Sequence, residues 1–154
     1  MSLKKSNSQP ELTIVIPAYK EEKRIGRTLD ELAIFLRNDQ LLKTIAVEVL
    51  VVSADSADKT HEIVISKNNK FDMLTLLKPG PKVGKGRDVQ LGMLRAKGKV
   101  VIFMDADLAT PLSYLFTERT RCISSKVPSA AFELMPRPRI NTRSDRRVNS
   151  CRLR

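Results

Sequence analysis

The stretch KVVIFMDADLATP, residues 99–111, joins an apolar run to two aspartates that stand one residue apart, Asp105 and Asp107. The run KVVIFM, residues 99–104, has the length and β-branched composition of a buried strand. Buried strands rarely end in paired like charges, because ionised carboxylates are costly to remove from water and repel one another. The two aspartates therefore indicate a positively charged group at the end of this strand.

Three earlier segments also predict strands. They are LTIVI at 12–16, VEVLVV at 47–52 and FDMLTLLK at 71–78. Each is a short apolar run rich in β-branched residues or leucine. We expect Pro17 to end the first of them.

Helical patterns lie between the predicted strands. Residues 21–38 carry apolar side chains at helical spacing, which predicts an amphipathic helix: Ile25, Leu29, Leu32 and Leu36. A second helix, capped by Ser56 or Asp58, is expected to run to about residue 67. Residues 87–98 predict a third. Strands alternating with helices favour an α/β fold with a parallel sheet, helices on both faces and right-handed crossovers.

Polar clusters follow most of these strands directly, at PAYKEE, SADSAD and DAD. In open α/β sheets, ligands bind at the carboxyl ends of the strands. Asp105 and Asp107 can face the same ligand, because alternate residues of an extended chain point the same way. Two convergent carboxylates suit Mg²⁺ or Mn²⁺, which prefer oxygen ligands. The alternative is an aspartate pair that opens a turn or caps the next helix.

The loop GPKVGKGRD, residues 80–88, is rich in glycine and basic residues but does not match a P-loop. Only three residues separate its first two glycines, and no Ser or Thr follows Lys85. Lys82, Lys85 and Arg87 could form an anion cradle at a helix N-terminus, or the loop could simply be solvated.

Composition limits the function classes. The 154 residues are 42% apolar and 29% charged, which is typical of a soluble globular protein. No apolar run approaches the roughly 20 residues of a membrane span, and no secretory signal is evident. We therefore expect a cytoplasmic protein. A single histidine, His61, and two cysteines without metal-ligand spacing leave little material for a histidine metal cluster or a catalytic triad.

Charge is concentrated in the last part of the chain. The net charge is +11, of which residues 112–154 supply +7. This segment has recurring prolines and neither helical nor strand periodicity, so we expect it to be disordered, the remnant of a truncated or frame-shifted gene. Binding of a polyanion or an acidic membrane is the alternative. Residues 1–11 are expected to be a flexible N-terminus, leaving 12–111 as the folded part.

Three ordered motifs carry a family resemblance: TIVIPAYKEEKRIGRTL, EVLVVSADSADKT and GKGRDVQLGMLRAKGKVVIFMDADLATP. Together they make residues 12–111 resemble the N-terminal half of family 2 glycosyltransferases. The likeness is greatest to enzymes that make dolichyl-phosphate glucose, dolichyl-phosphate mannose and related polyprenyl-phosphate sugars. The resemblance implies the GT-A fold, a Rossmann-like nucleotide-sugar-binding half that stops here after the D-x-D strand.

The resemblance also implies roles for individual residues. The residues after the first strand would line the nucleoside site: Pro17, Ala18, Tyr19 and Glu21. Asp105, Ala106 and Asp107 would be the family's D-x-D, with Asp105 near the ribose and both carboxylates at the metal. Lys85 and Gly86 would lie near the diphosphate or the lipid phosphate.

The sequence departs from the family pattern in two places. The family's base-contacting aspartate falls at Ala54, so Asp55 would have to substitute for it. The acceptor half, which carries the catalytic base, has no counterpart, so the catalytic residue is unknown.

The function implied is hexose transfer from a nucleotide sugar of the UDP-glucose or GDP-mannose type to a polyprenyl or dolichyl phosphate. Peripheral association with the cytoplasmic face of a membrane is compatible with such an acceptor, and the chain itself could be an inactive fragment. One alternative is a module that binds the nucleotide sugar without transferring it. Another is a basic nucleic-acid-binding protein, but the tail offers few aromatic side chains for base stacking, so no nucleic acid is expected as a partner.

Overall fold

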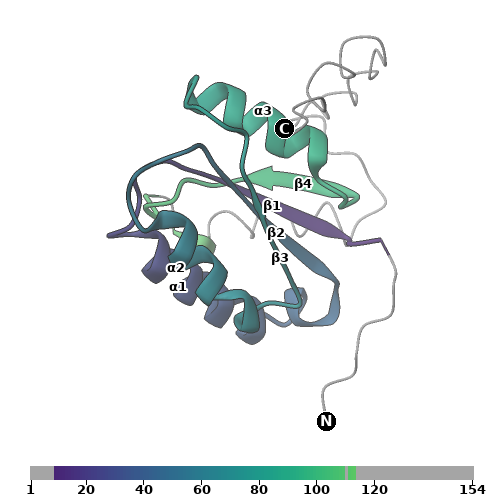
Figure 1. The fold of residues 1–154 in the computed structure, drawn as a ribbon. Helices are drawn as coiled ribbons and strands as arrows, with labels where there is room; N and C mark the ends of the chain where they lie inside the picture. Colours follow the sequence, from purple (N-terminus) through teal and green to yellow (C-terminus); the bar gives the residue numbers. More distant parts are fainter. Residues whose placement is uncertain (1–8, 110, 114–154) are drawn as a thin grey trace.

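The computed structural model describes residues 9–109 and 111–113. Their core is a sheet of four parallel strands in the order β3-β2-β1-β4 (Figure 1). The strands are β1 (Leu12–Ala18), β2 (Val47–Ser53), β3 (Met73–Leu77) and β4 (Val100–Phe103). The predicted parallel α/β sheet is confirmed.

Helices cover both faces of the sheet, as predicted. Figure 1 shows α1 (Ile25–Asn38) and α2 (Thr60–Ser66) on one face and α3 (Lys85–Arg95) on the other. Two short 3₁₀ helices, η1 (Leu42–Thr44) and η2 (Asn68–Lys70), precede β2 and β3. Successive strand residues point to opposite faces, so Ile14 and Ile16 pack in the α1 core while Val15 packs on the α3 side.

Helix α3 lies unusually close to the sheet at Gly92. A Cβ on Gly92 would lie 2.4 Å from the Cγ1 of Val15 and 2.9 Å from the Cγ2 of Val52. Both distances are below any normal carbon–carbon contact, so only glycine fits. The close approach fixes which side of α3 faces the sheet.

The expectation that Pro17 ends the first strand is wrong, because β1 continues through Pro17 to Ala18. The carbonyl of Val15 accepts a hydrogen bond from the N–H of Met104, on the β4 side. Successive residues of a strand direct their backbone groups to opposite neighbouring strands, so Pro17, two residues after Val15, also faces the β4 side. The last paired residue of β4 is Phe103, opposite Val15. The missing N–H of Pro17 therefore costs the sheet no hydrogen bond.

Other boundaries shift by a few residues. The third strand is shorter than predicted, α2 starts at Thr60, and α3 starts at Lys85 and ends at Arg95. His61 is half-buried in the first turn of α2, where its Nε2 lies 3.2 Å from the carbonyl oxygen of Ser53. It therefore joins α2 to the end of β2.

Residues 9–11 and 112–113, outside the predicted 12–111 segment, are among the described residues. Glu11 donates its backbone N–H to the carbonyl of Ala46, and Leu112 packs against the main core. The predictions for residues 1–8 and for the tail at 114–154 lie outside the described residues. Among the residues that are described, no helix has the length and apolarity needed to cross a membrane.

Candidate functional site

A cleft of about 240 Å³ lies at the carboxyl ends of β1 and β4, beside the N-terminus of α3. Three segments far apart in the sequence supply its walls. The lining residues are Pro17, Ala18, Tyr19, Glu21, Lys82, Lys85, Asp88, Asp105, Ala106 and Asp107.

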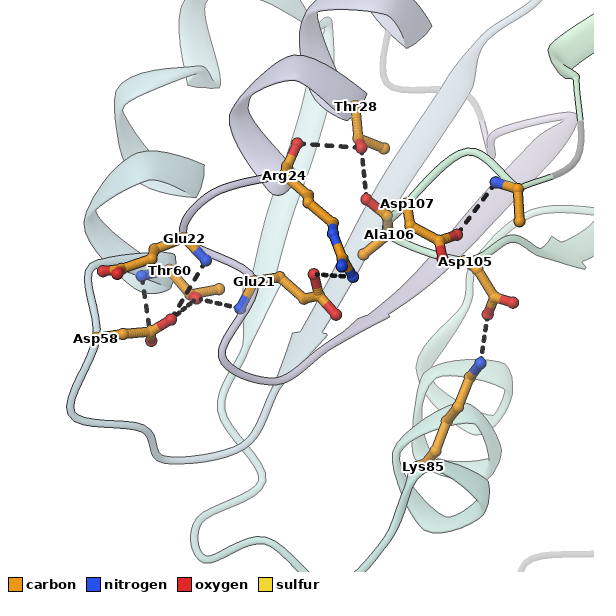
Figure 2. A network of polar contacts seen from close by, with 11 residues as sticks. Glu21, Glu22, Arg24, Thr28, Asp58, Thr60, Lys85, Asp105, Ala106 and Asp107 are labelled. Atoms are coloured by element: carbon orange, nitrogen blue, oxygen red, sulfur yellow. Dashed lines mark hydrogen bonds and ion pairs between the residues drawn. The ribbon is translucent and has the colours of Figure 1, made fainter.

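The loop between β1 and α1 is fixed by Glu21. Its backbone N–H donates to the hydroxyl of Thr60 on α2, at 3.0 Å. Its carbonyl oxygen accepts from the N–H groups of Arg24 and Ile25, which starts α1. Its carboxylate lies 3.6 Å from the guanidinium of Arg24 (Figure 2). Glu21 therefore holds this wall of the cleft to both helices of one face.

Asp58 ties the loops after β1 and β2 together. Its carboxylate accepts hydrogen bonds from the hydroxyl of Thr60 at 2.7 Å and from the backbone N–H of Glu22 (Figure 2). It also accepts one from the hydroxyl of Ser56. Burial of Asp58 opposes its ionisation, but these hydrogen bonds outweigh burial and lower the pKa of Asp58 below its usual value. An ionised Asp58 thus joins the loops after β1 and β2 without itself lining the cleft.

The loop after β4 carries Asp105, Ala106 and Asp107. The hydroxyl of Thr28 on α1 donates to the carbonyl of Ala106, which anchors the middle of this loop (Figure 2). The Oδ1 of Asp107 accepts from the N–H of Ala109 at 3.1 Å, and Leu108 adopts a positive φ of 55°. Asp107 therefore forms a turn as well as lining the cleft, so the two interpretations of the aspartate pair are compatible.

Asp105 has an oxygen that lacks a hydrogen-bond donor. Its Oδ1 is buried, and the Nζ of Lys85 lies 2.6 Å away, outside hydrogen-bonding geometry. In the described part of the chain, no donor satisfies this oxygen. Lys85, the first residue of α3, therefore offsets the charge of Asp105 through an ion pair.

Lys82 covers the ring of Tyr19. Its Nζ lies 3.7 Å from the ring centroid, within the range of a cation–π contact. This contact places the basic loop against the β1–α1 loop. Of the three basic residues considered from the sequence, Lys82 and Lys85 line the cleft and Arg87 does not.

Asp88, in the first turn of α3, lines the cleft and was not among the predicted site residues. It is only 4% exposed. Burial raises the pKa of Asp88 above its usual value, although the nearby charges of Arg87 and Lys82 oppose the shift. The sequence held one signal: Asp88 precedes Gly92 by four residues and so shares its sheet-facing side.

Most of the predicted site residues meet in this cleft. Those that line it are Pro17, Ala18, Tyr19, Glu21, Lys85, Asp105, Ala106 and Asp107. Asp55 and Gly86 are not in the lining. The backbone N–H of Asp55 donates to the carbonyl of Gly80 at 2.9 Å, at the same edge of the sheet.

The donor set fits a divalent cation that takes part of its ligands from another molecule. Four acidic and two basic side chains line the cleft, so a bound anion would need an added positive charge. Within residues 9–109 and 111–113, no three His, Cys, Asp or Glu side chains are grouped to hold a metal alone. Asp105 and Asp107 offer carboxylate oxygens, and phosphate oxygens commonly complete the shell of Mg²⁺.

Comparison with known proteins gives a consistent result. Residues 13–115 match the family described as Glycosyl transferase family 2. Dolichyl-phosphate beta-glucosyltransferase ALG5A of Trichomonas vaginalis is 36% identical over 102 residues, covering 66% of this chain and 32% of the relative. The dolichyl-phosphate beta-glucosyltransferase of Drosophila melanogaster is 38% identical over 103 residues, covering 65% and 32%. The chain thus spans about a third of the length of these curated relatives.

Two solved structures share the fold. S. aureus TarS 1-349 in complex with UDP-GlcNAc has a TM-score of 0.54 and 31% identity, over 63% of this chain and 26% of that one. The mannosyltransferase PcManGT from Pyrobaculum calidifontis, in complex with GDP-Man and Mn²⁺, has a TM-score of 0.52 and 26% identity, over 68% and 34%. Both have nucleotide sugars bound, and the second also has a divalent metal.

Proposed function

The chain belongs to glycosyl transferase family 2, and on this basis we propose that its cleft binds the diphosphate of a nucleotide sugar with Mg²⁺ or Mn²⁺. The donor would be of the UDP-glucose or GDP-mannose type. One observation carries the proposal: three segments far apart in the sequence, the loop after β1, the start of α3 with the loop before it, and the loop after β4, meet in a single cleft. The nucleotide sugars in the two similar structures support it.

The nucleoside would lie against the end of β1. Pro17, Ala18, Tyr19 and Glu21 form this wall, and the ring of Tyr19 offers a flat apolar surface. The contact between Lys82 and that ring would have to open or shift for a base to stack there. Asp55, at the same edge of the sheet, would reach the base from outside the cleft.

The diphosphate would lie between the loop after β4 and the start of α3. Asp105 and Asp107 would hold the cation, whose charge would stabilise the departing nucleoside diphosphate. Lys85 lies beside Asp105, so it can offset the charge of that carboxylate and also approach a phosphate. Gly86, whose Cβ position meets no atom within 4 Å, leaves the backbone of the first turn open to an anion.

The complete reaction would transfer a hexose to a polyprenyl or dolichyl phosphate, as the names of the relatives suggest. This acceptor would bring the protein to a membrane surface. A module that binds nucleotide sugar without transferring it remains the second candidate. Detection of glucosyl transfer to a dolichyl phosphate by the 154-residue chain would exclude it.

Calorimetry on Asp107→Asn tests the proposed site. The parent chain should bind UDP-glucose or GDP-mannose in Mn²⁺ and lose most of that affinity in a chelator. The variant should bind as weakly in Mn²⁺ as the parent does in the chelator, because one cation ligand is weakened. Asp72→Asn is the matched control, since Asp72 is exposed at the opposite edge of the sheet. A variant that binds with the affinity of the parent would overturn the assignment.

A further inference from the structure

Asp88 is a mostly buried residue whose carboxyl group faces the cleft, and no described residue donates a hydrogen bond to it. The residue is 4% exposed and lines the cleft, and among the described residues the only enclosed side-chain oxygen without a hydrogen-bond partner is the Oδ1 of Asp105. Among the described residues, neither a hydrogen-bond donor nor a cation is within bonding distance of its carboxylate. The hydrogen-bonding capacity of this carboxyl group is therefore open to a molecule that enters the cleft.

The position of Asp88 follows from the packing of α3. Residues four apart on a helix share a face, so Asp88 points to the sheet as Gly92 does. Gly92 lies over Val15. Asp88 is one helical turn nearer the carboxyl edge, and Pro17, also in the lining, is the next residue of β1 on this face. The carboxyl group is thus on the side of the cleft that lies against the sheet.

The surroundings of Asp88 exclude several ligands. It does not form a metal-holding group with Asp105 and Asp107 among the described residues. A carboxylate repels phosphate. The charges of Lys82 and Arg87 act on Asp88 without forming an ion pair within 4.0 Å. Hydroxyl groups remain, because they can donate to a carboxylate and accept from a protonated carboxyl.

We propose that Asp88 binds two adjacent hydroxyl groups on one sugar ring of the nucleotide sugar. The inference rests on the proposed function and adds a residue that contributes to sugar recognition. A nucleotide sugar offers the same chemistry in two places, the ribose and the transferred hexose. The two carboxyl oxygens of Asp88 can each receive one hydroxyl, which makes the contact selective for a particular arrangement of hydroxyls.

Binding of UDP and UDP-glucose to Asp88→Ala, measured by calorimetry in Mn²⁺ on the 154-residue chain, tests the proposal. UDP-glucose should bind on the order of 10-fold or more weakly, since hydrogen bonds to a charged group are lost. An unchanged affinity for UDP assigns the hexose, and an equal loss for UDP assigns the ribose. Asp88→Asn should lose less, because an amide still bonds to hydroxyls.

Glu62→Gln is the matched control, because Glu62 is an exposed acid in the first turn of α2. It should leave both affinities unchanged. Analogues lacking one ribose or glucose hydroxyl give a second readout that a purely structural role would not affect. At least one analogue should bind the parent more weakly than UDP-glucose does. The same analogue should bind Asp88→Ala or Asp88→Asn with nearly the affinity that UDP-glucose has for that variant.

The proposal is overturned if the parent binds UDP-glucose and Asp88→Ala binds it equally well. It is also overturned if every deoxy analogue loses the same factor in parent and variant. Failure of the parent to bind either UDP-glucose or GDP-mannose would instead refute the proposed function.

Discussion

A mostly buried acidic residue lies beside each end of α3, and the two carboxyl groups differ in their hydrogen-bond partners. Glu48, on β2 at the amino edge of the sheet, is 3% exposed. Its Oε2 accepts hydrogen bonds from the hydroxyl of Thr13 at 2.7 Å and from the N–H of Lys97 at 3.0 Å. Asp88, at the carboxyl edge, is 4% exposed and has no such partner among the described residues. The first carboxyl group stabilises the fold, and the second is left for a ligand.

The packing around the two carboxyl groups also differs, since it is tight near Glu48 and open near Asp88. Near Glu48 the chain is closed: a Cβ on Gly98 would lie 2.5 Å from the backbone nitrogen of Thr13, whose hydroxyl accepts from the N–H of Gly98 at 2.8 Å. Near Asp88 the chain leaves a cleft of about 240 Å³. Burial alone therefore does not distinguish a structural carboxylate from a binding one, whereas hydrogen-bond satisfaction does.

Substitution of Glu48 should have the largest effect on stability. Glu48→Ala leaves the hydroxyl of Thr13 and the N–H of Lys97 without their acceptor inside the protein. We expect the free energy of unfolding to fall by about 3 kcal/mol, measured by urea denaturation. The control is Glu11→Ala, which removes only an exposed ion pair with Lys99 and should cost less than about 1 kcal/mol. Equal losses in the two variants would contradict the structural role.

Substitution of Asp88 by Asn should change the free energy of unfolding by less than Glu48→Ala does, and should raise it rather than lower it. The raised pKa of Asp88 means that folding opposes its ionisation. Its contribution to stability is therefore fully present below the unfolded pKa of about 3.8 and is lost as the pH rises through the folded pKa. At neutral pH, Asp88→Asn should be as stable as the parent or more stable by up to about 1 kcal/mol.

Urea denaturation between about pH 3 and pH 7 checks this sign. The curves of parent and variant should converge towards the acidic end and separate as the pH rises. An Asp88→Asn variant that is clearly less stable than the parent at neutral pH would show that Asp88, like Glu48, supports the fold.

Much of the fold follows from local patterns. Apolar runs, helical spacing and the polar clusters after strands were sufficient to predict a parallel sheet with helices on both faces. The same clusters, ordered as in a known family, predicted most of the cleft lining. Each motif lies directly after a strand or at the start of a helix, so its position depends little on distant contacts.

The remainder depends on tertiary structure. Pro17 continues a strand because β4 ends before it could pair there, which no local signal reveals. Asp88 was not predicted as a site residue, because its burial follows from the close approach of Gly92 to Val15, which the sequence does not reveal. The sequence of the loop around Lys82 is compatible with both a solvated loop and a site, whereas the contact of Lys82 with Tyr19 depends on tertiary structure. The role of Asp55 stays a prediction.

Hydrogen–deuterium exchange of the 154-residue chain, with and without UDP-glucose and Mn²⁺, tests the central claim most directly. The claim is that the carboxyl edge of the sheet binds the nucleotide sugar while the amino edge only supports the fold. Added ligand and metal together should slow exchange at residues 18–21, 84–88 and 105–109, with little change at 46–48 and 97–99. Slowed exchange confined to the amino edge, or no change at the three cleft segments under saturating ligand, would contradict the account.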